Sequence, residues 1–258
     1  MVRHPTAVIH PSARVPESCT IGPYCVIGKA VTLGEHCELI SHVVLDGPAL
    51  VGAHNRFFPF CAVGTEPQDI SYHGEPTRIE IGDHNVIREY VTLNRGTVKG
   101  GGVTRIGSHT LIMAYAHVGH DSMISDHAML INAATLAGHV VVEEWAVVGA
   151  LCAVHQFIRV GAHAYIGGGT VITQDVLPFS LTSASRNVKA YGMNRVGLER
   201  RGFTRERLAK IRHAYRVLLN SRLNTTQAVE KLRAEADSGP DVEMLLRFVE
   251  TSERGFLK

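Results

Sequence analysis

The most regular feature of the chain is an aliphatic or aromatic residue that returns every six positions. This pattern runs over residues 9–63, resumes over 81–93, and runs again over 106–172, in fixed phase within each block. A helix needs apolar spacing near 3.6 residues and a half-buried strand needs 2, so neither explains a period of six. Six residues fit one short strand plus a tight turn, and three such units close a triangular coil. The pattern therefore predicts a parallel β-helix of hexapeptide repeats.

The first interruption of the repeat lies between Val63 and Ile81. The phase is kept across this gap, but its two anchors would be Asp69 and Glu75. Burying unpaired carboxylates is costly, so an extra coil is disfavoured. We expect instead a loop near residues 66–80.

The second interruption separates Leu93 from Ile106 by 13 residues, which is one residue out of phase. The segment contains three consecutive glycines at 100–102. Such a run is a strong loop signal, so a second loop is predicted near residues 95–105. Loops that leave a rigid scaffold often carry function.

The composition changes toward the C-terminus, which predicts a β-helix over residues 1–190 and a helical domain over 191–258. Residues 195–258 hold 14 Lys and Arg against 9 Asp and Glu, a net charge of +5, whereas residues 1–194 hold 12 against 15, a net charge of −3. Thr204 is a good N-cap for a first amphipathic helix. Two further helices are expected near 226–236 and from 238 onward.

The overall composition excludes several classes of protein. Hydrophobic residues make up 45% of the 258 positions and charged residues 19%, which is unlike a disordered chain. The net charge of +2 does not indicate a nucleic-acid-binding protein. No apolar run reaches the roughly 18 residues of a membrane span, and the N-terminal residues contain no apolar signal segment.

The five cysteines share one place in the repeat, four residues after an anchor, where the side chain points into the narrow coil. We therefore expect buried, reduced thiols rather than disulfides or metal ligands, which fits a reducing, cytoplasmic setting. These residues are Cys19, Cys25, Cys37, Cys61 and Cys152.

The repeat also sorts the 15 histidines. Eight of them lie three residues after an anchor, at a turn, where a solvent-exposed structural role is the simplest interpretation. These are His36, His42, His54, His84, His109, His127, His139 and His163. The chemistry is expected mainly among the histidines outside this position.

Three histidines stand off the common position and invite a chemical interpretation: His117, His120 and His155. Asp121 follows His120 and could accept its ring proton, which would fix the imidazole tautomer and raise its basicity. A general base near neutral pH needs both properties. The His-x-x-His spacing alone would equally suit a metal pair.

Stacking then brings further residues to His120. One coil is 18 residues, so residues separated by 18 lie on neighbouring coils at the same edge. The expected cluster contains His120, Gly138, His139, His155 and Gln156.

Several longer motifs go beyond the hexapeptide pattern. With them the chain resembles the acyl-carrier-protein-dependent UDP-N-acetylglucosamine 3-O-acyltransferases of lipid A biosynthesis, over both the repeats and the helical tail. The motifs are Gly74-Glu75-Pro76-Thr77, Ile81-Gly82-Asp83, Ile87-Arg88-Glu89, Arg95-Gly96-Thr97, Ala116 to Asp121, Leu136 to Val140, Val154 to Phe157, and Arg200-Arg201-Gly202-Phe203.

The resemblance implies a left-handed β-helix and a reaction. A 3-hydroxyacyl chain would pass from acyl carrier protein to the 3-hydroxyl of UDP-N-acetylglucosamine, with no metal or other cofactor. His120 would be the general base, Asp121 would orient it, and the backbone N–H of Gly138 would stabilise the oxyanion.

The resemblance also implies binding residues and an assembly. The family is trimeric, with sites between subunits, and Gly168 matches the position that limits acyl-chain length. Residues expected to bind the nucleotide sugar are Asp69, His117, His139, His155 and Gln156, with Asn194, Arg200 and Arg201 reaching it from a neighbouring subunit. The basic tail would suit docking of an acidic carrier protein.

Two alternatives remain open at this point. Ser71 stands where the family commonly has Lys, Val196 where relatives often carry an acid, and Asn94 where His is common, so the acceptor could be a different nucleotide sugar. A zinc-dependent γ-type carbonic anhydrase would instead use His117, His120 and His139 as metal ligands.

Overall fold

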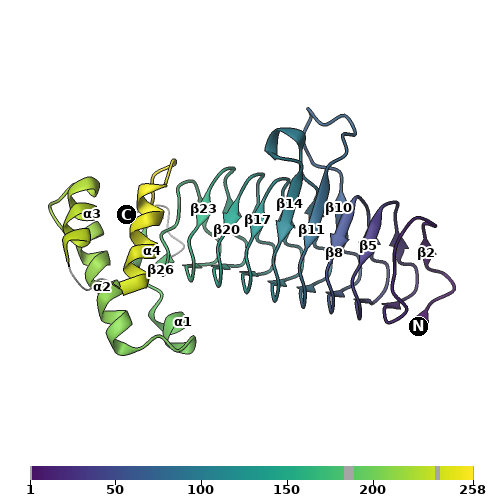
Figure 1. Cartoon of the computed structure of the whole chain (residues 1–258), viewed down its shortest axis with the longest axis horizontal. Helices are drawn as coiled ribbons and strands as arrows, with labels where there is room; N and C mark the ends of the chain where they lie inside the picture. The colour runs from purple at the N-terminus through teal and green to yellow at the C-terminus, as the bar shows by residue number, and fades with distance from the viewer. Residues whose placement is uncertain (1, 183–188, 236–238, 258) are drawn as a thin grey trace.

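The computed structural model describes residues 2–182, 189–235 and 239–257. These residues form a long left-handed parallel β-helix with a group of α-helices at its C-terminal end (Figure 1). The predicted fold class is therefore confirmed. The coil has three flat sides, each of which is one sheet.

The first side, sheet A, is continued by an antiparallel pair at its end, β26 with β27, whereas its other pairings are parallel. Its strands are β1 (Val2–Arg3), β3 (Thr20–Ile21), β6 (Glu38–Leu39), β9 (Arg56–Phe57), β12 (Val86–Ile87), β15 (Leu111–Ile112), β18 (Met129–Leu130), β21 (Val147–Val148), β24 (Tyr165–Ile166), β26 (Ser180–Thr182) and β27 (Ala190–Met193).

The other two sides are wholly parallel. Sheet B contains β2 (Val8–Ile9), β4 (Val26–Ile27), β7 (Val44–Leu45), β10 (Ala62–Thr65), β13 (Thr92–Asn94), β16 (His117–Val118), β19 (Thr135–Leu136), β22 (Ala153–Val154) and β25 (Val171–Ile172). Sheet C contains β5 (Val31–Leu33), β8 (Ala49–Val51), β11 (Arg78–Ile81), β14 (Val103–Ile106), β17 (Met123–Ile124), β20 (Val141–Val142) and β23 (Arg159–Val160).

The six-residue anchors form the core of the coil. Those from Ile21 to Ile172 are buried, while Ile9 and Val15 at the open N-terminal end are only partly covered. Anchors on neighbouring coils pair directly, as Val118 does with Leu136. The repeat period thus fixes both the strand register and the core.

The cysteines point inward, as predicted, and all five are buried free thiols. Burial raises the pKa of Cys61 to about 12. Since the thiolate is the reactive form, this thiol is inert at neutral pH. A small buried side chain explains this use of cysteine.

The eight repeat histidines occupy the corners between sheets, where each has a positive φ between 52° and 60°. His tolerates this left-handed conformation better than most residues. The rings stack from coil to coil, for example His54 on His84 with 4.6 Å between centroids. The expectation of a solvent-exposed histidine was wrong for His127, His139 and His163, which are partly buried.

Both predicted loops leave the same side of the solenoid, next to β10 and β14 (Figure 1). Strand β11 begins at Arg78, so residues 78–80 of the expected first loop are in fact strand. The second loop contains the short 3₁₀-helix η1 (Val98–Gly100) and ends where β14 begins at Val103.

Within the described part of the chain, four helices follow the coil: α1 (Arg195–Arg200), α2 (Arg205–Asn220), α3 (Thr225–Ala234) and α4 (Gly239–Glu250). Thr204 caps α2 as predicted, because its side chain accepts a hydrogen bond from the N–H of Arg207. Residues 236–238, at the expected boundary between the last two helices, lie outside the described residues. Among the described helices, none combines the length and the apolar character needed to cross a membrane.

The helices pack on the end of the coil through one apolar cluster. This cluster joins Leu177 and Phe179 of the solenoid to residues of α2, α3 and α4. The hydroxyl of Tyr215 in α2 donates to the carbonyl of Pro178. His163 lies at this junction, with its ring stacked on Phe179 and edge-on to Phe203.

We predict that His163 makes the fold acid-sensitive. Burial, aided by the positive charge of Arg201, lowers the pKa of His163 from 6.5 to about 4. Between pH 6.5 and pH 4 the His163 ring is therefore protonated in the unfolded chain but neutral in the folded chain. The free energy of unfolding is unaffected by this group above pH 6.5 and decreases as the pH falls toward 4. Because the ring is partly exposed, we expect this group to cost roughly 2 kcal/mol at pH 4.5.

Denaturant unfolding of His163→Phe at pH 7 and 4.5 tests this. The variant should lose less stability than wild type between the two pH values. His36→Phe, at an exposed corner, is the matched control and should behave like wild type. An equal loss in wild type and His163→Phe would contradict the prediction.

Candidate active site

A groove of about 540 Å³ runs along sheet B and the turns that follow its strands. The turns after β16, β19 and β22 lie one above another on successive coils, as the 18-residue stacking predicts. The groove is lined by Gln68, Asn94, His117, Gly119, His120, Thr135, Leu136, Ala137, Gly138, Ala153, Val154, His155, Gln156 and Val171.

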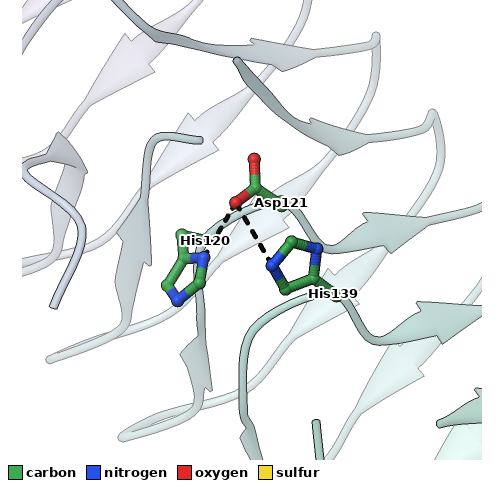
Figure 2. A group of neighbouring side chains, drawn as sticks. All are labelled: His120, Asp121 and His139. Carbon is green, nitrogen blue, oxygen red and sulfur yellow. Dashed lines mark hydrogen bonds and ion pairs between the residues drawn. The ribbon is translucent and has the colours of Figure 1, made fainter. Parts of the chain in front are cut away.

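His120 and Asp121 form a hydrogen-bonded pair at the turn after β16 (Figure 2). The Nδ1 atom of His120 lies 2.8 Å from Oδ2 of Asp121. A carboxylate can only accept, so Nδ1 carries the proton and Nε2 is left as the basic nitrogen. The His120 side chain is 13% exposed and that of Asp121 is 0% exposed, so the imidazole can meet a ligand while the carboxylate stays behind it.

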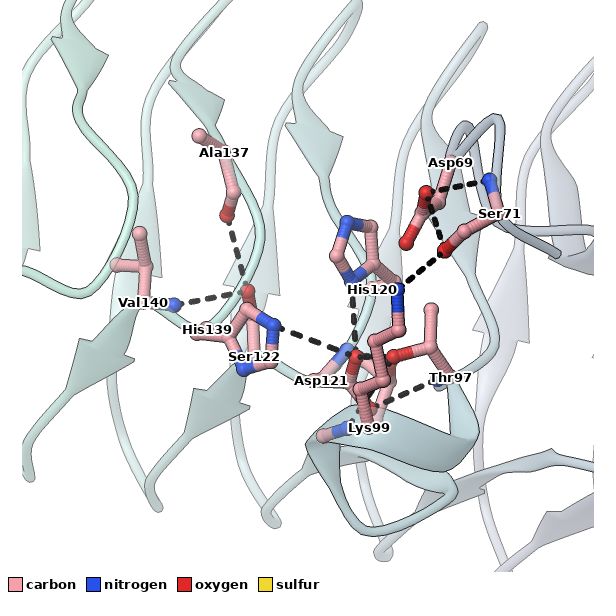
Figure 3. Close-up of polar contacts among 12 residues, drawn as sticks. Asp69, Ser71, Thr97, Lys99, His120, Asp121, Ser122, Ala137, His139 and Val140 are labelled. Atoms are coloured by element: carbon pink, nitrogen blue, oxygen red, sulfur yellow. Dashed lines mark hydrogen bonds and ion pairs between the residues drawn. The ribbon is translucent and has the colours of Figure 1, made fainter.

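The second loop encloses the Asp121 carboxylate (Figure 3). The N–H of Thr97 donates to Oδ1 at 2.8 Å and its hydroxyl donates to Oδ2 at 2.6 Å. A Cβ on Gly96 or on Gly100 would lie 2.7 Å or less from an Asp121 oxygen. These glycines are therefore required for the loop to close on the carboxylate.

His139 is the third member of this group (Figure 2). Its Nε2 atom lies 3.7 Å from Oδ2 of Asp121, and its ring is perpendicular to that of His120. The other face of the ring stacks on Phe157. Burial, opposed by the charge of Asp121, lowers the pKa of His139, so this imidazole is neutral at pH 7.

Gly138 stands one coil above His120, at the same position of the repeat. Among the described residues, none accepts a hydrogen bond from its N–H. The repeat explains this, because Pro23 and Pro59 occupy the same position on other coils, where the ladder needs no donor. A Cβ on Gly138 would lie 2.6 Å from the ring of His120, so the close approach requires glycine.

His120, Asp121 and His139 are also close enough together for a metal ion, since their ligand atoms all lie within 4.8 Å of one another. The first two atoms, however, are in direct hydrogen-bond contact at 2.8 Å. Two ligands on one tetrahedral zinc ion would be about 3.4 Å apart. The geometry therefore fits an imidazole oriented by a hydrogen bond rather than two ligands of one zinc ion.

Three more of the predicted residues line the groove, and a fourth lies on the first loop. His117 projects from β16 and its Nδ1 is 2.7 Å from the hydroxyl of Thr92, while burial lowers its pKa. His155 and Gln156 line the groove on the turn after β22. Asp69 lies on the first loop, and its pKa is held low chiefly by the N–H of Ser71, with a smaller effect of His120.

The remaining predicted residues are not brought to this groove within one chain. Asn194 caps α1 and donates to the carbonyl of His163 at 3.0 Å. Arg201 donates to the carbonyl of Trp145, at the corner between sheets C and A, and Arg200 is exposed at the end of α1. Gly168 lies on the turn after β24, at the opposite edge of sheet B.

The sequence pattern did not reveal that Thr97 holds Asp121 or that Gln68 lines the groove. Both lie on loops, where the six-residue phase gives no register. The Arg95-Gly96-Thr97 motif marked the right segment without indicating that Thr97 holds Asp121. The glycine run at 100–102 was a second signal, since one of these glycines faces that carboxylate.

A β-helix of hexapeptide repeats with an oriented histidine and a bare backbone N–H beside it defines a hexapeptide-repeat acyltransferase. Residues 175–257 match a family model described as UDP-N-acetylglucosamine O-acyltransferase, domain 2. The chain belongs to the acyl-[acyl-carrier-protein]–UDP-N-acetylglucosamine O-acyltransferase family.

This membership rests on relatives of that name. The enzyme of Alkalilimnicola ehrlichii is 48% identical over 199 residues, 77% of each chain, and that of Stutzerimonas stutzeri is 44% identical over 212 residues, 82% of each chain. The solved UDP-N-acetylglucosamine acyltransferase of Francisella novicida is 40% identical, with a TM-score of 0.96 over 100% of this chain and 94% of its own. The family membership disfavours the carbonic anhydrase alternative.

We predict that Gly138→Ala displaces the His120 ring. The added methyl group would lie 2.6 Å from Cε1, far inside van der Waals contact, so the ring must move and its bond to Asp121 must lengthen. Imidazole ¹⁵N chemical shifts report the tautomer and should lose the pattern of a fixed Nδ1–H. Gly28→Ala is the control, since its methyl group would meet the far end of the Asp46 side chain. Unchanged His120 shifts in Gly138→Ala would refute the geometry.

Proposed function

We propose that this enzyme transfers a 3-hydroxyacyl chain from acyl carrier protein to the 3-hydroxyl of UDP-N-acetylglucosamine, the first step of lipid A biosynthesis. The single observation that carries the proposal is the His120–Asp121 pair, set against the N–H of Gly138, with no described residue hydrogen-bonded to that N–H or to Nε2 of His120. Acyl transfer needs a base for the attacking hydroxyl and a donor for the developing oxyanion. The names of the relatives supply the substrates.

The proposed reaction has two steps. Nε2 of His120 takes the proton of the sugar hydroxyl as its oxygen attacks the thioester carbonyl, and the N–H of Gly138 donates to the oxyanion that forms. The tetrahedral intermediate then collapses, the carbon–sulfur bond breaks, and His120 returns its proton to the leaving thiolate. Asp121 stabilises the imidazolium between these steps and remains ionised throughout.

The other groove residues would bind the acceptor. His117 and His139 are neutral by virtue of burial and can both donate and accept hydrogen bonds. His155 donates from Nδ1 to the carbonyl of Gln156 at 3.1 Å, so its Nε2 is an acceptor. Asp69 adds a carboxylate. Such a mixed set suits the hydroxyl and amide groups of a sugar.

The assembly belongs to the same proposal. Asn194, Arg200 and Arg201 lie away from the groove of their own chain, and in a homotrimer they would reach the nucleotide in a neighbouring one. The basic C-terminal region would dock the acidic carrier protein in the cytoplasm. Gly168, which has no side chain to block the far edge of sheet B, would leave room for a long acyl chain.

The alternative function is the same acyl transfer to a different nucleotide sugar, and the residue at position 94 is the observation in its favour. Asn94, a groove residue, donates to the carbonyl of Glu66 and to the hydroxyl of Thr65, so its amide fixes the start of the first loop. A histidine there would line the groove differently. With Asn94 in place of that histidine, a different nucleotide sugar would be the better substrate. Comparing kcat/KM for several UDP-sugars decides between the two acceptors.

We predict that His120→Ala lowers kcat by roughly 10²–10⁴-fold, the usual contribution of a positioned general base. The measurement is turnover of UDP-N-acetylglucosamine with 3-hydroxyacyl carrier protein. His36→Ala, an exposed corner histidine of the same coil architecture, should retain full activity. Near-normal turnover of His120→Ala would rule out the base, and the absence of turnover in wild type would rule out the reaction.

A further inference from the structure

The two loops that enclose the site are joined at the rim of the groove by a hydrogen-bonded chain (Figure 3). The ammonium of Lys99 donates to the hydroxyl of Ser71 at 3.1 Å, and that hydroxyl donates to Oδ1 of Asp69 at 2.9 Å. The N–H of Ser71 donates to the same oxygen at 2.8 Å. We call Lys99, Ser71 and Asp69 the rim cluster.

The backbone holds the rim cluster in place on both sides. Lys99 lies in the 3₁₀-helix η1 (Val98–Gly100), whose N-cap is Thr97, the residue that donates two hydrogen bonds to Asp121. The guanidinium of Arg95 donates to the hydroxyl of Tyr72 at 2.9 Å and so fixes the first loop against the second. The ammonium is therefore positioned by the same short segment that positions the catalytic carboxylate.

The rim cluster has binding capacity to spare. An ammonium has three donors, and toward the described residues Lys99 uses one of them, on Ser71. Among the described residues, none donates to the second oxygen of Asp69. A free donor and a free acceptor thus stand together within the electrostatic influence of His120, which contributes to the low pKa of Asp69.

The charge of the cluster selects its ligand. The carboxylate of Asp69 balances the ammonium of Lys99, so the rim offers hydrogen bonds with little net charge. A diphosphate would be attracted by Lys99 but repelled by Asp69. A neutral ring with adjacent hydroxyls fits better, since one hydroxyl can accept from Lys99 while its neighbour donates to Asp69.

We propose that Lys99 is an acceptor-binding residue, which holds the sugar ring of the nucleotide substrate by its hydroxyls and so presents the reacting hydroxyl to His120. This inference rests on the proposed function. It adds to that function Lys99 of the second loop, whose ammonium is hydrogen-bonded to the side chain of Ser71. The diphosphate of the same substrate is the competing ligand, and the experiment separates the two.

The test compares wild type with Lys99→Gln, using steady-state kinetics and calorimetric binding of UDP-N-acetylglucosamine and of UDP. We expect KM and the Kd for the UDP-sugar to rise about tenfold, as for one lost hydrogen bond to a charged donor. The kcat should change less than about threefold, and the Kd for UDP should stay constant. Lys29→Gln, an exposed lysine near the N-terminus, is the matched control.

A second variant moves the charge instead of removing it. In Ser71→Lys combined with Lys99→Gln, the ammonium returns to the same rim from the first loop, and we expect KM to recover most of the way toward wild type. If the KM of the double variant is as high as that of Lys99→Gln, the proposal that the ammonium acts beside position 71 is contradicted.

The remaining outcomes are distinct. An unchanged KM in Lys99→Gln, with active wild type, overturns this inference and leaves the acyltransferase proposal standing. An equal loss of affinity for UDP and for the UDP-sugar overturns the sugar assignment in favour of the diphosphate. Wild type that neither turns over nor binds the UDP-sugar overturns both proposals together. Because Lys99 is exposed, its replacement should leave the melting temperature unchanged.

Discussion

Each coil turns three corners, and almost every corner needs one residue in the left-handed backbone conformation. For a residue other than glycine this costs about 1–2 kcal/mol. The fold offsets the cost by stacking corner side chains from coil to coil, as His84 and His109 do with 4.9 Å between centroids and planes 4° apart. The abundance of histidine follows from this constraint, because a flat ring that tolerates positive φ satisfies both requirements.

The candidate active site depends on the same left-handed backbone conformation at a corner. Asp121 has φ of 60° and occupies the corner position where other coils have a histidine or an aromatic residue. His120 precedes it, at the position where the ladder needs no N–H, and Gly138 repeats that position one coil later. A carboxylate, an imidazole and a free amide therefore meet because they sit at adjacent positions of one repeat, with no local distortion of the solenoid.

The sequence was informative wherever the six-residue phase held. The buried anchors, the inward cysteines and the stacking of residues 18 apart all follow from one period. The phase fails on the loops, where contacts such as Thr97 with Asp121 and Lys99 with Ser71 depend on three-dimensional closure. It also fails where the coil meets the helices, because the partial burial of His163 depends on its contact with Phe203, which lies far along the chain. The motif resemblance recovered some loop residues without giving their contacts.

The three corners also limit what one chain can do. His120 lies at the corner between sheets B and C, whereas Arg201 is bound to Trp145 at the corner between sheets C and A. The coil between these corners is continuously hydrogen-bonded and packed, so no bending of a single solenoid brings them together. If Arg201 contacts the substrate held at His120, a second copy must supply it. The homotrimer and the nucleotide contacts of Asn194, Arg200 and Arg201 are therefore one hypothesis: disproof of the assembly would remove these residues from the site and leave His120, Asp121 and Gly138 in place.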